Sequence, residues 1–300
     1  MLRLAVATTA ETYDRMRDPL GERGIEVRHV ETAERAIDIA AGEGAYAVGD
    51  DTEESAPFDV GFVFPSRLAE GGVADGLLGI PWVNGREAIL RSRQKGETLA
   101  RLSRAGVPVP DSVVVSDPAD QSTLREVFAR FEPPVVVKPN STTRGIGVAK
   151  AHDLDSFLGV CDYLDLVHDY RATGDRSFLV QEYLPAATDY RVMLVDGEVV
   201  GAVERRLPDD ALAAGQWKHN VHRGADATGV SLDPELEQLA GRAAQALDIP
   251  WLGVDLLVSE GRAVVNETNA RPTIDSATKY QAGFWDDLAA LIRSRAPEDG

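Results

Sequence analysis

One hairpin near the C-terminal end constrains the fold of this 300-residue chain more than any other stretch. Residues 253–269 are predicted to form two apolar strands joined at residues 259–261, where Gly261 supplies the positive φ of a tight turn. The first strand carries Asp255, and the second carries Glu267 and Asn269. The hairpin therefore brings three oxygen-bearing side chains into one small region.

The length of the turn decides whether these three side chains share a face of the sheet. Glu267 and Asn269 share one because they are two residues apart in one strand. A three-residue turn puts Asp255 on that face too, whereas an even turn sends it to the other side unless a bulge corrects the register. Two carboxylates and an amide oxygen suit a hard cation such as Mg²⁺. The alternative is a solvated acidic strand face that binds nothing.

The first part of the chain alternates strands with helices. Strands are expected at 2–8, 25–30, 45–48, 60–64 and 80–83, and helices at 11–23, 33–43 and 66–75. This alternation predicts a parallel sheet in a small, doubly wound α/β domain over residues 1–92. No Gly-x-Gly-x-x-Gly follows the first strand, so the dinucleotide-binding fingerprint is absent.

Beyond residue 92 the pattern continues and then changes. Up to residue 182 we expect helices at 95–105, 121–131 and 154–169, and strands at 112–116, 135–138, 148–150 and 178–182. From Asp189 onward, tight turns such as Asp196-Gly197 join neighbouring strands. Residues 205–229 read as irregular, and the last helices are expected at 234–246 and 285–294. The fold class is therefore α/β, passing into a mixed α+β arrangement.

Two stretches have the residue types of a nucleotide site. An apolar strand delivers Lys138 to a loop of small and hydroxyl residues that ends at Gly145-Ile-Gly147, and such a loop can cradle phosphate oxygens with its N–H groups. It is not a Walker loop, because the lysine precedes the glycines and a strand follows. The strand end Glu182-Tyr-Leu184 can contact a purine. The alternatives are a hairpin with a long tip and an ordinary strand end.

Composition excludes several classes of protein. A net charge of −18 argues against general nucleic-acid binding, and neither a signal peptide nor an apolar membrane span is visible. The single cysteine, Cys161, agrees with a reducing cytoplasm. Only five residues are lysines, and an acidic, lysine-poor surface is typical of proteins adapted to concentrated salt. We therefore expect a salt-adapted (halophilic) cytoplasmic protein without membrane partners, whose few lysines are retained for specific roles.

In order and spacing, these pieces resemble the ATP-grasp superfamily and, within it, the RimK-like carboxylate–amine ligases of the α-L-glutamate type. The resemblance covers roughly residues 85–275. Its motifs are Lys95, Val107-Pro-Val-Pro110, Val137-Lys-Pro139, Gly145-Ile-Gly147, Gln181-Glu-Tyr183, Asp189-Tyr-Arg191, Asn220-Val-His-Arg-Gly224, Gly253-Val-Asp255 and Glu267-Thr-Asn269. The family's fold implies a two-lobed ATP-grasp unit after the first domain, with the phosphate loop in residues 93–182 and the metal site in residues 183–300.

The resemblance also implies roles for these residues, with ATP and two Mg²⁺ (or Mn²⁺) ions as cofactors. Lys95, Lys138 and Lys218 would contact the phosphates, and the loop with Gly145 and Gly147 would close over them. Glu182, Tyr183 and Leu184 would hold the adenine and Asp189 the ribose. Asp255, Glu267 and Asn269 would bind the two metal ions, with Glu267 bridging them.

Several polar residues remain for the other substrates. Arginine binds carboxylates and oxyanions in a bidentate manner, so we assign Asn220, Arg223 and Arg271 to the carboxylate substrate or its acyl phosphate. Surface ion pairs are the alternative for each arginine. His219 and His222 are either proton acceptors for an amine or packing residues. Glutamate-adding relatives commonly continue the metal strand as Asn-Ser-Ser-Pro-Gly, whereas this chain has Asn269-Ala-Arg-Pro-Thr273, which leaves the acid substrate open.

The leading hypothesis is an ADP-forming ligase that joins a small-molecule or peptide carboxylate to an amine or amino acid such as glutamate. Phosphorylation would give an acyl phosphate, and attack by the amine would release phosphate and form the amide. A small-molecule kinase and a non-catalytic nucleotide-binding module are the alternatives. The oligomeric state is left open, a homo-oligomer included.

Overall fold

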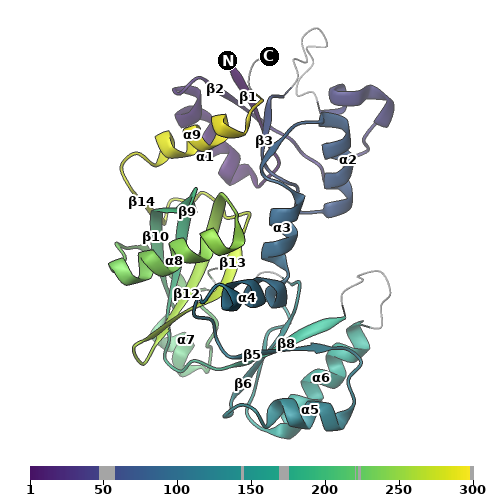
Figure 1. Ribbon diagram of the computed structural model, residues 1–300, viewed down its shortest axis with the longest axis vertical. Coiled ribbons are helices and arrows are strands. Elements are labelled where there is room, and N and C mark those ends of the chain that lie inside the picture. Colours follow the sequence, from purple (N-terminus) through teal and green to yellow (C-terminus); the bar gives the residue numbers. More distant parts are fainter. Residues whose placement is uncertain (47–57, 143–144, 169–175, 220, 222–223, 298–300) are drawn as a thin grey trace.

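The computed structural model describes residues 1–46, 58–142, 145–168, 176–219, 221 and 224–297. Its three main sheets succeed one another along the chain. Figure 1 shows that the C-terminal sheet lies between the other two along the longest axis, with the N-terminal sheet above it and the central sheet below it. The helices α3 (Arg86–Arg93) and α4 (Lys95–Arg104) connect the N-terminal sheet to the central one.

The N-terminal sheet is parallel with the order β2-β1-β3-β4, which confirms the predicted α/β arrangement. Its strands are β1 (Leu2–Val6), β2 (Ile25–His29), β3 (Val60–Val63) and β4 (Trp82–Asn84), and its helices are α1 (Ala10–Gly21) and α2 (Leu68–Leu78). Side chains alternate along β1, so Leu4 and Val6 join a core cluster with α1, whereas Ala5 and Ala7 join one with α2. The sheet is therefore covered on both faces.

The central sheet is antiparallel with the order β5-β8-β6-β7. Its elements are β5 (Ser112–Ser116), α5 (Gln121–Phe128), β6 (Val135–Pro139), β7 (Ala149–Ala151), α6 (Leu154–His168) and β8 (Ser177–Glu182). Asp120 caps α5 by accepting the N–H of Thr123 at 2.8 Å. Val135 and Val137 pack in the core with α5 and α6, so Val136 and Lys138 point to the opposite face.

The C-terminal sheet has the order β11-β10-β9-β12-β13, with β14 paired to β10. Its elements are β9 (Thr188–Val195), β10 (Glu198–Arg206), α7 (Asp209–Ala213), β11 (Asp226–Gly229), α8 (Pro234–Leu247), β12 (Trp251–Ser259), β13 (Arg262–Asn269) and β14 (Lys279–Tyr280). The apolar stripe of α8 packs in one core cluster with β9, β12 and β13.

The last helix, α9 (Phe284–Arg295), returns to the N-terminal sheet. Its buried residues Phe284, Leu288 and Ile292 share a core cluster with residues of β1, β3 and α1, and Figure 1 shows α9 beside α1. The start and end of the chain therefore build one core together, and the division at residues 92 and 182 stays a prediction.

Three predicted segments differ from the structure or lie partly outside the described residues. No α-helix spans residues 33–43, because Glu34 and Gly42 have the positive φ values of 59° and 56°; a 3₁₀ segment, η1 (Ile39–Tyr46), is found instead. The strand expected at 45–48 falls partly on η1 and partly outside the described residues. The stretch 205–229, expected to be irregular, contains α7 and β11.

The turn of the C-terminal hairpin also differs from the prediction. Ser259 pairs directly with Arg262, so the turn has two residues, Glu260 and Gly261, with φ values of 51° and 78°. An even turn in a regular ladder would put Asn266 opposite Asp255. A bulge restores the expected geometry: Leu256 pairs with Val265 and Asp255 pairs with Glu267, so Asn266 is the extra residue.

Candidate active site

A pocket of about 450 Å³ lies between the central and C-terminal sheets. Its walls come from β6 and β8 on one side, from β9, β10, β12 and β13 on the other, and from residues 216–219 of the loop after α7. This volume is in the range of small-molecule sites. Most of the residues that the sequence assigned to a nucleotide and a metal line this pocket or contact residues that do.

Four of the five lysines of the chain gather at this pocket. Lys138 and Lys218 line it, and Lys95 forms an ion pair with Glu267 at 3.3 Å. The ammonium group of Lys150 lies 4.6 Å from the ring centre of Tyr183, which is also a lining residue. The fifth lysine, Lys279, hydrogen-bonds Ser231 elsewhere. A rare residue type is thus concentrated at one pocket, where its positive charge would attract anions.

Lys138 is held by two neutral oxygen acceptors. Its Nζ donates to Gln181 Oε1 at 2.5 Å and to Asn266 Oδ1 at 2.9 Å. Burial lowers the pKa of Lys138 to about 8, although the nearby carboxylate of Glu267 opposes this shift. Lys138 forms no ion pair with the carboxylates that the structure describes, so its buried ammonium retains the capacity to bind an incoming anion.

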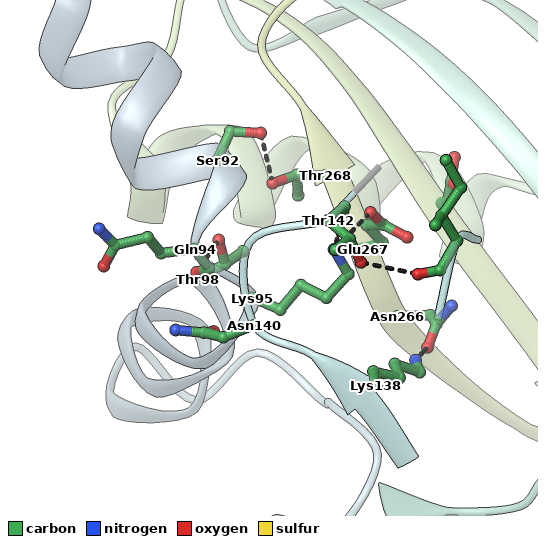
Figure 2. Close-up of polar contacts among 12 residues, drawn as sticks. Ser92, Gln94, Lys95, Thr98, Lys138, Asn140, Thr142, Asn266, Glu267 and Thr268 are labelled. Carbon is green, nitrogen blue, oxygen red and sulfur yellow. Dashed lines mark hydrogen bonds and ion pairs between the residues drawn. The ribbon is translucent and has the colours of Figure 1, made fainter. Parts of the chain in front are cut away.

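The loop that follows Lys138 is attached to the first turn of α4, as Figure 2 shows. Asn140 accepts the backbone N–H of Gly96 on its side chain at 2.8 Å, and Lys95 Nζ donates to the carbonyl of Thr142. Gly145 and Gly147 have φ values of 64° and 74°, in the left-handed region that suits glycine. Residues 143 and 144 of this loop, the second of which is Arg144, lie outside the described residues.

The two carboxylates of the hairpin stand on directly opposite positions. Asp255 pairs with Glu267 across β12 and β13, and Asn269 lies two residues further on the same face. Asp255 is buried and accepts two hydrogen bonds from Arg191, both at 2.8 Å, while Arg205 lies 3.0 Å away. Burial opposes ionisation of Asp255, but the two guanidinium groups hold its pKa well below the usual range.

Asp189, assigned to the ribose, is also buried and lines the pocket. It accepts two hydrogen bonds from Arg205, at 2.5 and 3.0 Å. Burial raises the pKa of Asp189 to about 6 in spite of this partner. His219 Nδ1 lies 4.0 Å from Asp189, and burial, followed by the charge of Arg205, lowers the pKa of His219.

Two aromatic side chains also line the pocket. Tyr183 and Trp217 meet edge to face with ring centres 6.0 Å apart, and Lys150 lies over both rings. Leu184 is another apolar lining residue. Glu182 lines the pocket too, but its carboxylate accepts the N–H of Asp111 at 2.7 Å and pairs with Arg262 at 2.8 Å. Lys218 is held nearby through a hydrogen bond to the carbonyl of Val148.

Of the three residues assigned to the acid substrate, the structure describes Arg271 alone. Asn220 and Arg223 lie outside the described residues, as does His222. Arg271 is described: it donates to the carbonyl of Ala7 at 2.8 Å and to that of Phe64. Burial, followed by the nearby charge of Arg93, lowers the pKa of Arg271 to about 10. It therefore lies where the C-terminal sheet meets the N-terminal one.

Sequence reasoning missed Gln181, Arg205 and Asn266 as residues of the pocket. Gln181 was visible in its motif, but nothing marked its side chain as the acceptor for Lys138. Asn266 faces the pocket only because of the bulge, since strict alternation would separate it from Glu267. Arg205 is 50 residues from Asp255 in the sequence, and only the pairing of β9 with both β10 and β12 brings them together.

The donors fit a hard divalent cation, since the hairpin offers two carboxylates and an amide oxygen on one face. Asn269 Oδ1 already accepts the N–H of Arg271 at 2.8 Å, and the carboxylates of Asp255 and Glu267 face arginine and lysine. Within the described ranges, no cluster of three or more His, Cys, Asp or Glu side chains suits a metal. A cation here would thus depend on these two carboxylates, Asn269 and the phosphates of a bound nucleotide.

None of the helices among the described residues combines the length and the apolar character that a membrane span requires.

Known proteins resemble this chain in sequence and in fold. A probable alpha-L-glutamate ligase of Citrobacter koseri is 33% identical over 205 residues, and a ribosomal protein bS6–L-glutamate ligase of Escherichia coli is 32% identical over 205 residues. Each match covers 68% of this chain but only 64% of the relative.

Two solved structures superpose on nearly the whole chain. The RimK domain ATP-grasp protein of Sphaerobacter thermophilus has a TM-score of 0.64 at 21% identity, and covers 98% of this chain and 99% of its own. The D-alanine–D-alanine ligase of Bacillus anthracis, solved with ATP, has a TM-score of 0.68 at 17% identity, with 98% and 97% covered. The model of the RimK-like ATP-grasp domain matches residues 92–289, and the chain belongs to that family.

Proposed function

We propose that this protein is an ATP- and Mg²⁺-dependent carboxylate–amine ligase that forms an amide through an acyl phosphate. One observation carries the proposal: four of the five lysines converge with the opposed carboxylates of Asp255 and Glu267 on a single pocket. Phosphoryl transfer depends on positioning and charge neutralisation, which is what such a set of groups provides. The ligase names of the curated relatives support the same reaction class.

The residues divide the work along the pocket. Tyr183, Leu184 and Trp217 would pack against the adenine, and Lys95, Lys138 and Lys218 would neutralise the phosphates beneath the glycine loop. Asp255, Glu267 and Asn269 would hold Mg²⁺, which supplies charge neutralisation at the phosphate oxygens. Asp189 pairs with Arg205 and so holds this guanidinium close to Asp255. We therefore assign two roles to Asp189: it positions Arg205, and it contacts the ribose.

The test is ADP release over pairs of candidate acids and amines, with L-glutamate among the amines. A ligase releases ADP in proportion to an amide product, and only when both substrates are present. K138M should abolish this activity, whereas K279M, which removes a lysine remote from the pocket, should retain it. A phosphorylated acid that accumulates without amide would show a kinase instead, and ATP binding without turnover for any pair would leave only a nucleotide-binding module.

A further inference from the structure

Two arginines meet where the C-terminal sheet adjoins the N-terminal one. Arg93 ends α3 and donates to the carbonyl of Ser66 at 2.6 Å. Arg271 follows β13 and donates to the carbonyls of Ala7 and Phe64. These carbonyls come just after the carboxyl ends of β1 and β3, and those of Phe64 and Ser66 are only two residues apart. Both guanidinium groups therefore lie at one edge of the parallel sheet, the edge where open α/β sheets bind ligands.

Neither guanidinium contacts a carboxylate among the residues that the structure describes. Three other arginines near the candidate active site, Arg191, Arg205 and Arg262, all pair with acids. Among the described residues, Arg93 and Arg271 contact only carbonyl oxygens, although the chain has 49 acidic residues for 31 basic ones. Two adjacent, partly buried cations without a counterion are unfavourable, so this arrangement is suited to an anion that the protein itself does not supply.

The arginine pair is joined directly to the proposed metal strand. The hydroxyl of Ser92 hydrogen-bonds Thr268 at 3.1 Å and the N–H of Ala270 at 3.0 Å, so the end of α3 is fixed to the end of β13. Arg93 comes next to Ser92, and Lys95, two residues later, pairs with Glu267 (Figure 2). Residues 93–95 thus carry two cations: Lys95 faces the proposed phosphate site, and Arg93 faces the N-terminal sheet.

We propose that Arg93 and Arg271 bind a carboxylate of the substrate that the reaction does not consume. The proposal rests on the ligase function above. The planar guanidinium fork binds carboxylates in a bidentate manner, and after their carbonyl contacts both side chains keep free N–H groups. The bound group is either the α-carboxylate of an amino acid that acts as the amine, or the second carboxylate of a dicarboxylic acid that acts as the acid.

The experiment measures binding of two probes, L-glutamate for the first source and glutarate for the second, by calorimetry with MgADP present. R93Q removes one guanidinium, and R91Q is the matched control, because Arg91 lies on the same helix and also donates to a carbonyl, that of Leu247. We expect at least one probe to bind wild type and R91Q equally, and R93Q at least about tenfold more weakly. The α-amide of glutamate or the monoamide of glutarate should show the same loss in wild type.

A purely structural role would lower the unfolding midpoint of R93Q without this selective effect on carboxylates. Equal binding of both probes by wild type and R93Q, or no binding of either probe by wild type, would overturn the subsite even if the ligase assay succeeds. Conversely, the ligase assay could fail while R93Q still loses probe binding. That result would refute the ligase function but would support the anion site. In active preparations, R93Q should raise KM for the carboxylate-bearing substrate and change kcat little.

Discussion

At the scale of single residues, several charged side chains of the site already form ion pairs within the protein. Lys95 faces Glu267 and Asp255 faces Arg191 and Arg205, whereas the buried Lys138 donates to the neutral side-chain oxygens of Gln181 and Asn266. Paired charges balance each other locally, so Lys138 is the cation with the most to gain from a phosphate.

Lys138 should make ATP affinity depend on pH. Its pKa of about 8 in the free protein means that the ammonium loses its proton as pH rises through 8, whereas a bound phosphate would keep it protonated. ATP binding should therefore weaken roughly fivefold between pH 8 and pH 9, and be nearly constant below pH 7. Titration calorimetry across this range measures it. K138Q should bind more weakly with a flat profile and K279Q should follow wild type; a flat wild-type profile would contradict the assignment.

Glu267 gives a prediction about the metal. E267Q keeps the shape of the side chain but removes the charge, so Mg²⁺-dependent ADP release should fall by more than the roughly 10- to 100-fold that loss of an outer partner of a metal ligand costs. E260Q, in the exposed turn of the same hairpin, is the control and should not differ from wild type. Equal turnover of E267Q and wild type at any Mg²⁺ concentration would refute the metal role.

At the scale of elements, much of the arrangement could be predicted from local pattern. The alternation of strands and helices gave the parallel N-terminal sheet, and α4, β5 and α8 were placed to within a residue. The sequence left open whether the hairpin turn is odd or whether a bulge corrects an even turn, because either arrangement puts Asp255 on the face of Glu267. Contacts such as Arg271 with Ala7, 264 residues apart, have no local pattern at all.

The glycine loop after β6 offers a test at this scale. A Cβ on Gly147 would lie 2.7 Å from the ring of Pro139, and its φ of 74° disfavours any L side chain. G147A should therefore cost about 1–2 kcal/mol of unfolding free energy and weaken ATP binding. G159A, in the middle of α6 with no atom close to the new Cβ, should be neutral or stabilising. Denaturant titrations of both variants make the comparison; equal stability would show that the loop tolerates the change.

At the scale of the whole molecule, the dominant feature is a charge of −18 on 300 residues. With four of the five lysines at the pocket, the rest of the surface is acidic with scattered arginines. Self-repulsion destabilises the compact state and concentrated salt screens it, since the Debye length falls to about 3 Å at 1 M.

The unfolding midpoint should therefore rise by several degrees between low salt and molar KCl. Thermal scans followed by circular dichroism measure this, and NaCl should act like KCl if screening is the cause. Sucrose at matched osmolality is the control for a general effect of excluded solutes. An unchanged midpoint, with cooperative unfolding in water without added salt, would count against salt adaptation.

The bulge at Asn266 also determines which changes of length the hairpin could survive. If one residue were lost from β13 between the turn and Glu267, straightening of the bulge would leave Glu267 opposite Asp255. If one were lost from β12 between Asp255 and the turn, straightening would not help, and an apolar residue would face Asp255 instead. Insertions and deletions in this family should therefore be unevenly distributed over the two strands. Because Asn266 is one residue more than a regular ladder needs, a related sequence could lose a residue here and still keep its two carboxylates opposite each other.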